Sequence, residues 1–230
     1  MLIPIIQDYY RQGALPVPKH RVLTPFFPNC NLAVRKSVFN TVGQYDESLQ
    51  AAEDSDLCRR AAESGYRLFF EPGARVYHAC RPNLSALARQ WFSYGFWSAA
   101  VYKRNMEKRC EIYSSIVPVP RVNESMRFFS LRHFPFPVLV FMTYFSWILL
   151  LAAAALTALA AGAEAVSAGL GMGLLFYLLT LYIKHPVLRK VGPGEKIPFL
   201  GVSILINISC MAGSLAGGIR NRMFYIFSGI

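Results

Sequence analysis

The residues best placed to do chemistry are four consecutive polar residues at the start of an expected helix, Glu53, Asp54, Ser55 and Asp56. One of these carboxylates could act as a general base by accepting a proton from an attacking hydroxyl group. The same residue types are favoured in the first turn of any helix, where they accept backbone N–H bonds and complement the helix dipole. Asp54 and Asp56 also match the D-x-D pattern of metal-binding acids. The residues alone leave all three interpretations open.

Short secondary-structure elements are expected around this acidic cluster. Residues 31–34 are expected to form a strand that leads into a helix over 35–42, which Gly43 ends. The helix that begins at the cluster is expected to end at Gly65. Residues 67–79 are expected to form two short β segments around a Pro72-Gly73 turn.

An aromatic-rich helix is expected from Leu84 to Lys103, because apolar and aromatic side chains recur along it without a strongly charged face. Such a helix could lie in the headgroup zone of a membrane. It could equally be a core helix of a catalytic domain, and the pattern does not decide between the two.

The composition changes near Phe134. Charged residues make up 16% of the chain, well below the roughly 25% of an ordinary soluble domain. Of 24 Lys and Arg and 13 Asp and Glu, only 6 and 2 lie in residues 135–230. We interpret this boundary as the passage from water to lipid. The net charge of +11 suits anionic headgroups better than nucleic acid, because the basic residues flank hydrophobic runs and form no continuous stripe.

The cysteines and the N-terminus indicate the compartment. The five cysteines are an odd number with no C-x-x-C pair and no metal-ligand spacing. We interpret them as reduced thiols, which suits a segment that faces the cytoplasm. The N-terminus lacks a basic n-region and gains charges too early for a secretory h-region, so we expect no signal peptide.

Three apolar stretches could cross a membrane. They cover about Pro137 to Ala160, Val166 to Ile183 and Phe199 to Ile219, and about 20 apolar residues suffice to span a bilayer. The basic residues before the first stretch and after the second place both of these ends in the cytoplasm by the positive-inside rule. The third stretch contains Gly213, Gly217 and Gly218, so it could span the membrane or dip in and return. Three buried helices of a soluble domain are the remaining alternative.

Several motifs in order resemble the second half of the family 2 glycosyltransferases. The runs are NCNLAVRKSVFNTVGQYDESL, EDSDLCRRAAESGYRLFFEP, ARVYH and ARQWFSYG, and together they cover roughly Asn29 to Tyr102. The hydrophobic stretches that follow look like those of the membrane-bound branch, which builds bacterial exopolysaccharides and related cell-envelope glycans. The resemblance implies an α/β fold, here an incomplete GT-A-like segment, followed by an α-helical transmembrane region.

The resemblance also implies roles for individual residues. The Glu-Asp pair of the family opens a helix beside the acceptor, so Asp54 would be the general base and Glu53 its neighbour on the acceptor side. Asp56 would be a first-turn residue, and its D-x-D match with Asp54 a coincidence. His78 matches a histidine that in several relatives completes the metal or diphosphate site, and a neutral imidazole is a reasonable Mn²⁺ ligand. A lone histidine at a strand end can also be purely structural.

Arg89, Gln90 and Trp91 resemble, in shortened form, the Q-x-x-R-W signature of processive members of the family. Tyr94 and Gly95 follow where that signature has Arg-Trp, so the resemblance favours transfer of a single sugar over processive polymerisation. Arg89 could pair with a diphosphate, because a guanidinium binds phosphate through two parallel hydrogen bonds. It could also serve as a basic anchor at the lipid surface.

The implied reaction is a direct displacement with inversion. Asp54 would deprotonate an acceptor hydroxyl that attacks the anomeric carbon of a nucleotide sugar, and a divalent cation, Mn²⁺ or Mg²⁺, would stabilise the departing diphosphate. The expected partners are a nucleotide sugar, a lipid-linked or polysaccharide acceptor and membrane lipids, with no nucleic acid. The expected location is the inner (cytoplasmic) membrane, as a multi-pass protein with its catalytic segment in the cytoplasm.

The chain is expected to lack the nucleotide-binding half that carries the metal-binding acids of the fold. Residues 1–28 look like a linker and 29–105 like the acceptor-side half with its aromatic helix, while 106–134 look like a cytoplasmic linker before the membrane region at 135–230. A second polypeptide could supply the missing half. The alternative from another functional class is a non-catalytic membrane subunit or scaffold that keeps the acceptor-side surface. A small transport protein is a weaker alternative, because the spans offer few polar groups.

Overall fold

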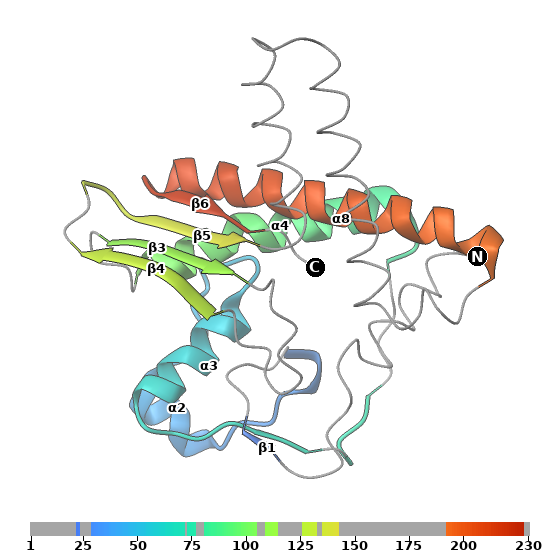
Figure 1. Ribbon diagram of the computed structural model, residues 1–230. Coiled ribbons are helices and arrows are strands. Elements are labelled where there is room, and N and C mark those ends of the chain that lie inside the picture. The colour runs from blue at the N-terminus through green and yellow to red at the C-terminus, as the bar shows by residue number, and fades with distance from the viewer. Residues whose placement is uncertain are drawn as a thin grey trace.

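The structure is a computed structural model of the 230-residue chain. The residues it describes are 22–23, 29–71, 73–76, 81–104, 109–114, 126–132, 135–142 and 192–227. Within these residues, helices predominate beside a small mixed sheet, and one long apolar helix lies near the C-terminus (Figure 1).

Two short helices form the first part of the described chain. Helix α2 spans Lys36–Val42 and ends at Gly43, whose φ of 79° suits a residue without a side chain. Helix α3 spans Glu53–Glu63, and Gly65, with φ of 84°, follows its end. Three acids lie in the first turn of α3, where they complement the helix dipole. Both helices confirm the elements expected from the sequence.

The strand expected over residues 31–34 is wrong. Asn29–Asn31 form a single 3₁₀ turn, η1, and residues 32–35 lie in no strand. The side-chain amide of Asn31 donates a 2.9 Å hydrogen bond to the carbonyl oxygen of Ala74. Asparagine side chains compete in this way with ladder hydrogen bonds, so the segment folds by local polar contacts.

Two short strands, one before and one after this region in the sequence, pair with each other in a single two-residue ladder. Strand β1, Val22–Leu23, pairs antiparallel with β2, Phe69–Phe70. The first of the two expected β segments is therefore confirmed as β2, and the backbone N–H of Ala74 donates to the carbonyl of Glu71 at the turn. Residues 74–76 lie in no strand, and residues 77–80 lie outside the described part.

Helix α4 covers Leu84–Lys103, as expected from the sequence. Its N-terminus is capped by Asn83, whose side-chain oxygen accepts a 2.8 Å hydrogen bond from the backbone N–H of Ala86. Helix α8 covers Pro193–Arg220 without interruption through all of its glycines. The two helices lie side by side over much of their length (Figure 1). This packing supports a core role for α4, and a position in the headgroup zone stays a prediction.

The remaining described strands form one four-stranded sheet. Its strand order is β4 (Met126–Arg132), β3 (Arg109–Ser114), β5 (Val138–Met142) and β6 (Phe224–Ile226). Strands β3 and β4 are antiparallel, whereas β5 is parallel to both β3 and β6. A small core of Ala99, Leu139, Met223 and Tyr225 joins α4 to this sheet.

The helix expected to begin at Pro137 is wrong at its start, because this segment forms strand β5 of the sheet. Residues 138–142 form a central strand, in which Leu139 is almost fully buried. A strand buried between two neighbours is apolar at successive positions, so its sequence looks like the start of a membrane helix. Residues 143–160 and the second expected span, 166–183, lie outside the described part of the chain. Strands β3 and β4 lie in the segment expected to be a linker, 106–134.

Helix α8 contains the third expected span. Among the described residues it is the one helix long and apolar enough to cross a membrane, judged by length and composition. Its 28 residues, at about 1.5 Å each, exceed the roughly 30 Å of a bilayer core. A buried core helix passes the same test, so this feature is compatible with both the spanning and the soluble interpretation.

Candidate active site

The candidate site lies at the N-terminus of α3, where Glu53 and Asp54 are the first two helical residues. Ala52 precedes them in a left-handed conformation, with φ of 64°, and supplies no side chain that could cap the helix. Both carboxylates therefore lie beside backbone N–H groups that have no partner within the helix. Asp54 itself is partly buried.

Asn29 connects both carboxylates to η1. Its backbone N–H donates a 3.1 Å hydrogen bond to Oδ2 of Asp54. Its side-chain amide donates a 2.7 Å hydrogen bond to Oε1 of Glu53, and its amide oxygen accepts a 2.8 Å hydrogen bond from the hydroxyl of Tyr45. Asn29 is thus a positioning residue that orients the two acids from 24 and 25 positions earlier in the chain.

The environment makes Asp54 a better proton acceptor than an exposed aspartate. Burial raises the pKa of Asp54 above 3.8, and the Glu53 carboxylate adds to the increase. The backbone hydrogen bonds from Asn29 and Ser55 act in the opposite direction but do not reverse the shift. The two N–H donors leave other lone pairs on the carboxylate oxygens for an acceptor hydroxyl.

Two tyrosines from different elements lie near this carboxylate. The pKa of Tyr45 is raised by burial and, to a lesser degree, by the charges of Cys58, Asp54 and Glu53. The pKa of Tyr94, on α4, is also raised by burial, and the charges of Asp54 and Cys30 contribute. Tyr45 is connected to Asp54 through Asn29, which accepts from the Tyr45 hydroxyl and donates to the Asp54 carboxylate.

The predicted site residues on α4 are Arg89, Gln90 and Trp91, and they differ in their surroundings. The side-chain amide of Gln90 donates a 2.7 Å hydrogen bond to the Tyr94 hydroxyl, and Trp91 meets the Tyr94 ring edge to face at 5.6 Å. Gln90 and Trp91 therefore both contact Tyr94 on the same helix. Arg89 is exposed and donates a 3.0 Å hydrogen bond to Oγ of Ser85, one turn earlier on the same helix.

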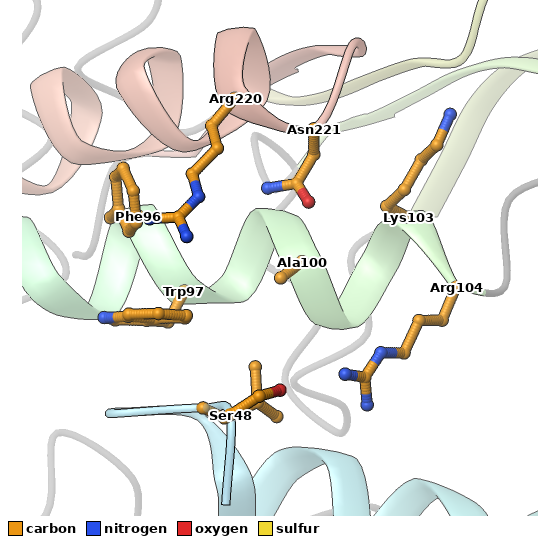
Figure 2. Close-up of a pocket in the computed structure, with 9 residues that line it drawn as sticks. Ser48, Phe96, Trp97, Ala100, Lys103, Arg104, Arg220 and Asn221 are labelled. Carbon is orange, nitrogen blue, oxygen red and sulfur yellow. The ribbon is translucent and has the colours of Figure 1, made fainter. Parts of the chain in front are cut away.

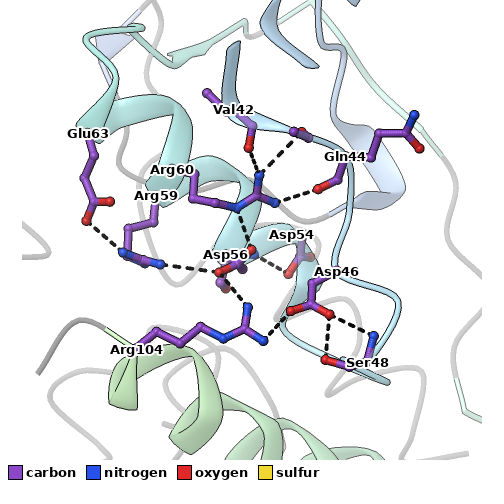
Figure 3. A network of polar contacts seen from close by, with 12 residues as sticks. Val42, Gln44, Asp46, Ser48, Asp54, Asp56, Arg59, Arg60, Glu63 and Arg104 are labelled. Atoms are coloured by element: carbon purple, nitrogen blue, oxygen red, sulfur yellow. Dashed lines mark hydrogen bonds and ion pairs between the residues drawn. The ribbon is translucent and has the colours of Figure 1, made fainter. Parts of the chain in front are cut away.

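Asp56 has an environment unlike that of Asp54. Its side chain is 1% exposed and forms ion pairs with Arg59 at 3.3 Å, Arg60 at 2.8 Å and Arg104 at 3.6 Å (Figure 3). Both carboxylate oxygens are thereby engaged by guanidinium groups. This arrangement agrees with the interpretation that the D-x-D match is a coincidence.

His78, predicted as a metal ligand, lies outside the described residues. Within the part of the chain that the structure describes, no group of three His, Cys, Asp or Glu side chains could hold a metal ion. The described residues by themselves therefore do not fit a resident metal.

Sequence reasoning missed Asn29, Tyr45 and Tyr94 as members of the site. Asn29 stands at the start of the quoted run NCNLAV, and Tyr94 lies four residues after Gln90 on one helix face. Both signals were present in the sequence. Only the structure shows that these residues share one carboxylate as neighbour.

Comparison with known proteins decides the family. A family model described as glycosyl transferase family group 2 matches residues 16–182 of this chain. The chain belongs to this family. The matched residues include the Glu53-Asp54 pair and α4, so the candidate site lies within the part of the chain that matches the family.

The chain is also similar to two curated proteins. Both are pre-mycofactocin glycosyltransferases of Mycobacterium tuberculosis, from strains CDC 1551 / Oshkosh and ATCC 25618 / H37Rv, and each is 35% identical over 105 residues. The alignment covers 45% of this chain and 22% of each relative. The chain thus matches about a fifth of the length of these relatives. No solved structure matches the chain.

Proposed function

We propose that this glycosyltransferase moves a single sugar, with inversion, from a nucleotide sugar to a lipid-linked or glycan acceptor at the membrane, with Asp54 as the general base. The observation that carries the proposal is the environment of Asp54. This carboxylate has a raised pKa and no cationic partner among the described residues, whereas Asp56, two positions later, is neutralised by arginines. A general base needs a pKa closer to the operating pH than that of a salt-bridged acid.

The proton transfer follows from this arrangement. An acceptor hydroxyl that donates to a free lone pair of Asp54 loses its proton to the carboxylate as its oxygen attacks the anomeric carbon. The bond from that carbon to the diphosphate oxygen breaks, and the nucleoside diphosphate leaves with the electron pair. Asn29 keeps the Asp54 carboxylate in place during the transfer and holds Glu53 beside it, on the acceptor side.

The acceptor would approach along α4. Gln90, Trp91 and Tyr94 form a connected amide and aromatic surface near Asp54. Aromatic faces and amide groups suit a sugar ring, which presents both C–H faces and hydroxyls. Arg89 lies on the exposed side of the same helix, and we assign it to a phosphate of donor or acceptor.

A divalent cation, Mn²⁺ or Mg²⁺, belongs to the proposal on the strength of the family resemblance. It would supply charge stabilisation for the departing diphosphate. His78 would be one ligand, together with residues of a nucleotide-binding half in the same or a second polypeptide.

The proposed location is the inner (cytoplasmic) membrane, with several spans and the site in the cytoplasm. Helix α8 is compatible with this attachment, since its length and composition suffice to cross a bilayer. The basic residues around the apolar stretches support the orientation.

The test compares Asp54→Asn with Glu47→Gln, an acid-to-amide control at an exposed position outside the site. Asparagine keeps an oxygen that can accept from the Asn29 N–H but cannot take a proton. Membranes that contain the full-length protein are supplied with a panel of labelled nucleotide sugars, and label transferred to lipid and glycan fractions is measured. We expect Asp54→Asn to reduce transfer by about 10²–10⁴-fold and Glu47→Gln to leave it unchanged.

Transfer by Asp54→Asn at the wild-type rate would remove Asp54 from the role of base. It would favour the alternative of a non-catalytic subunit that retains the acceptor surface of the family. Loss of transfer in both variants would show that the effect is not specific to Asp54.

A further inference from the structure

A cavity separate from the candidate site lies where the ends of α4 and α8 meet the turn before α3. Its volume is about 260 Å³, and its lining comes from three separate segments (Figure 2). The lining residues are Ser48, Leu49, Phe96, Trp97, Ala100, Lys103, Arg104, Arg220 and Asn221. None of the residues around Asp54 is among them.

The charge of this pocket is positive. Lys103, Arg104 and Arg220 line it, and none of the lining residues carries a carboxylate. Arg104 is neutralised, because it pairs with Asp46 and Asp56. Within the described part of the chain, Lys103 and Arg220 form no ion pair with an acid, so both leave their charge to the pocket.

Aromatic rings hold one of these cations in place. The guanidinium of Arg220 lies 5.6 Å from the ring centres of both Phe96 and Trp97. Such cation–π contacts stabilise an arginine without neutralising its charge. In Figure 2 the Arg220 side chain reaches down from the end of α8 toward these two rings on α4. The guanidinium is therefore positioned while its N–H donors stay available for an anion.

The two cations also have a structural role that must be separated from binding. Lys103 and Arg220 each lie in the last turn of a helix, where a positive charge complements the helix dipole. This role explains each residue on its own helix. It does not explain why Lys103 and Arg220, from two different helices, both line one cavity whose other lining residues include no acid. In Figure 2 the side-chain amide of Asn221 lies between the Arg220 guanidinium and the Lys103 ammonium.

We propose that this pocket is a binding site for a phosphate group, which the guanidinium of Arg220 binds directly while Lys103, farther along the same lining, adds positive charge. Arginine presents a planar fork of donors that matches phosphate oxygens, and lysine adds a mobile point charge. The group could belong to a lipid headgroup or to a soluble phosphate compound, and both sources present the same chemistry to the pocket. The site does not depend on Asp54 being catalytic.

The test measures binding of inorganic phosphate to the full chain in neutral detergent at low ionic strength, by calorimetry. The double variant Lys103→Ala/Arg220→Ala is compared with Lys36→Ala/Arg222→Asn, which removes the same charge outside the pocket. Asparagine is chosen because Arg222 has a left-handed φ of 52°, which asparagine tolerates. Lys103→Gln alone is a milder variant that keeps the proposal testable if the double variant does not fold.

We expect one saturable phosphate site per chain, about tenfold or more weaker in the pocket variant and little changed in the control variant. Absence of saturable binding to the wild type would overturn the proposal. Equal weakening in both double variants would also overturn it, because it would show an effect of net charge alone. A lower thermal midpoint with unchanged phosphate affinity would assign the two cations to helix stability only.

Binding to vesicles distinguishes a lipid headgroup from a soluble phosphate compound as the ligand. Vesicles of phosphatidylcholine alone are compared with vesicles that also contain phosphatidic acid, whose headgroup is an exposed phosphate monoester. Competition between phosphatidic acid and inorganic phosphate, lost in the pocket variant, would identify a lipid headgroup as the ligand. Binding of inorganic phosphate without such competition would identify a soluble phosphate compound.

Discussion

Asp54 and Asp56 show how far two residues of one helical turn can differ. Asp54 accepts backbone N–H bonds and has a raised pKa, whereas Asp56 is enclosed by three arginines. A helix places residues two positions apart on different faces, so one acid lies beside η1 and the other faces the inside of the molecule. This separation gives one acid the properties of a base and the other those of a structural anion.

The raised pKa of Asp54 predicts that the ionised form needed for activity lowers the stability of the fold. Since its folded-state pKa lies above the ordinary 3.8, the stability that Asp54 contributes is present below pH 3.8 and lost as the pH rises through the folded-state pKa. At neutral pH the ionised residue therefore destabilises the fold. Asp54→Asn should unfold at a higher temperature than the wild type at pH 7 and at a similar temperature in acid.

Scanning calorimetry across this pH range measures the difference. A lower unfolding temperature for Asp54→Asn at neutral pH would contradict the burial argument. Transfer activity of the wild type should decline as the pH falls through the raised pKa, because the base must be ionised to accept a proton.

At the scale of elements, glycines set the distance between α4 and α8. A Cβ atom at Gly213 would lie 2.0 Å from the carbonyl oxygen of Phe92, and one at Gly217 would lie 2.2 Å from that of Phe96. On the other helix, a Cβ atom at Gly95 would lie 2.0 Å from the carbonyl oxygen of Cys210. Gly213 and Gly217 are four residues apart, the small-xxx-small spacing that lets two helix backbones approach closely. The residues that looked like interruptions of α8 are its contact face.

This contact predicts opposite effects for two glycines of the same helix. Gly213→Ala should destabilise the protein by about 1–3 kcal/mol or more, because backbone atoms must move apart to admit the methyl group. A Cβ atom at Gly201, also in α8, would meet nothing within 4 Å, and Gly201→Ala should stabilise the helix by about 0.5–1 kcal/mol. Urea unfolding in detergent, followed by circular dichroism, checks both. Equal effects of the two substitutions would refute the close helix contact.

At the scale of the whole molecule, one ionic network ties three segments together (Figure 3). Arg60 donates to the backbone carbonyls of Val42, the last residue of α2, and of Gln44 just beyond it. It also pairs with Asp56 on α3. Arg104, at the end of α4, pairs with Asp56 and with Asp46. The network therefore fixes α4 relative to α3, and with it the distance between the aromatic surface and Asp54.

The stability that Asp46 contributes to this network depends on pH. Hydrogen bonds from Ser48, with a smaller contribution from Arg104, lower the pKa of Asp46 from 3.8 to about 2. A lowered folded-state pKa contributes stability above the unfolded value, and that stability is lost as the pH falls through the folded value. The contribution of Asp46 is thus complete at neutral pH and disappears only in strong acid.

Neutralising Asp56 should lower the free energy of unfolding much more than neutralising Glu63. Asp56→Asn leaves three guanidinium groups around a neutral side chain, and removing one partner of a buried ion pair costs about 3 kcal/mol or more. Glu63 pairs with Arg59 at 2.8 Å but is 58% exposed, so Glu63→Gln should cost less than about 1 kcal/mol. Chemical unfolding of both variants measures the difference, and similar costs would show that burial does not determine the strength of the network.

The sequence by itself determined the elements whose signals are local. Gly43 and Gly65 predicted where α2 and α3 end. The bounds of α4 were correct because its apolar and aromatic pattern is continuous along the helix. The motif order also predicted the family, which the family model confirms. Each of these signals is contained in a short stretch of chain, where capping and side-chain periodicity decide the outcome.

Only the tertiary structure decided the rest. A short apolar run such as residues 138–142 is compatible with both a strand and a helix. Its pairing with β3 and β6 makes it a strand. The hydrogen bond from Asn29 to Asp54 and the cavity shared by α4, α8 and the turn before α3 join residues far apart in the chain. The gain from such contacts depends on which surfaces are buried together, and no local stretch of sequence contains that information.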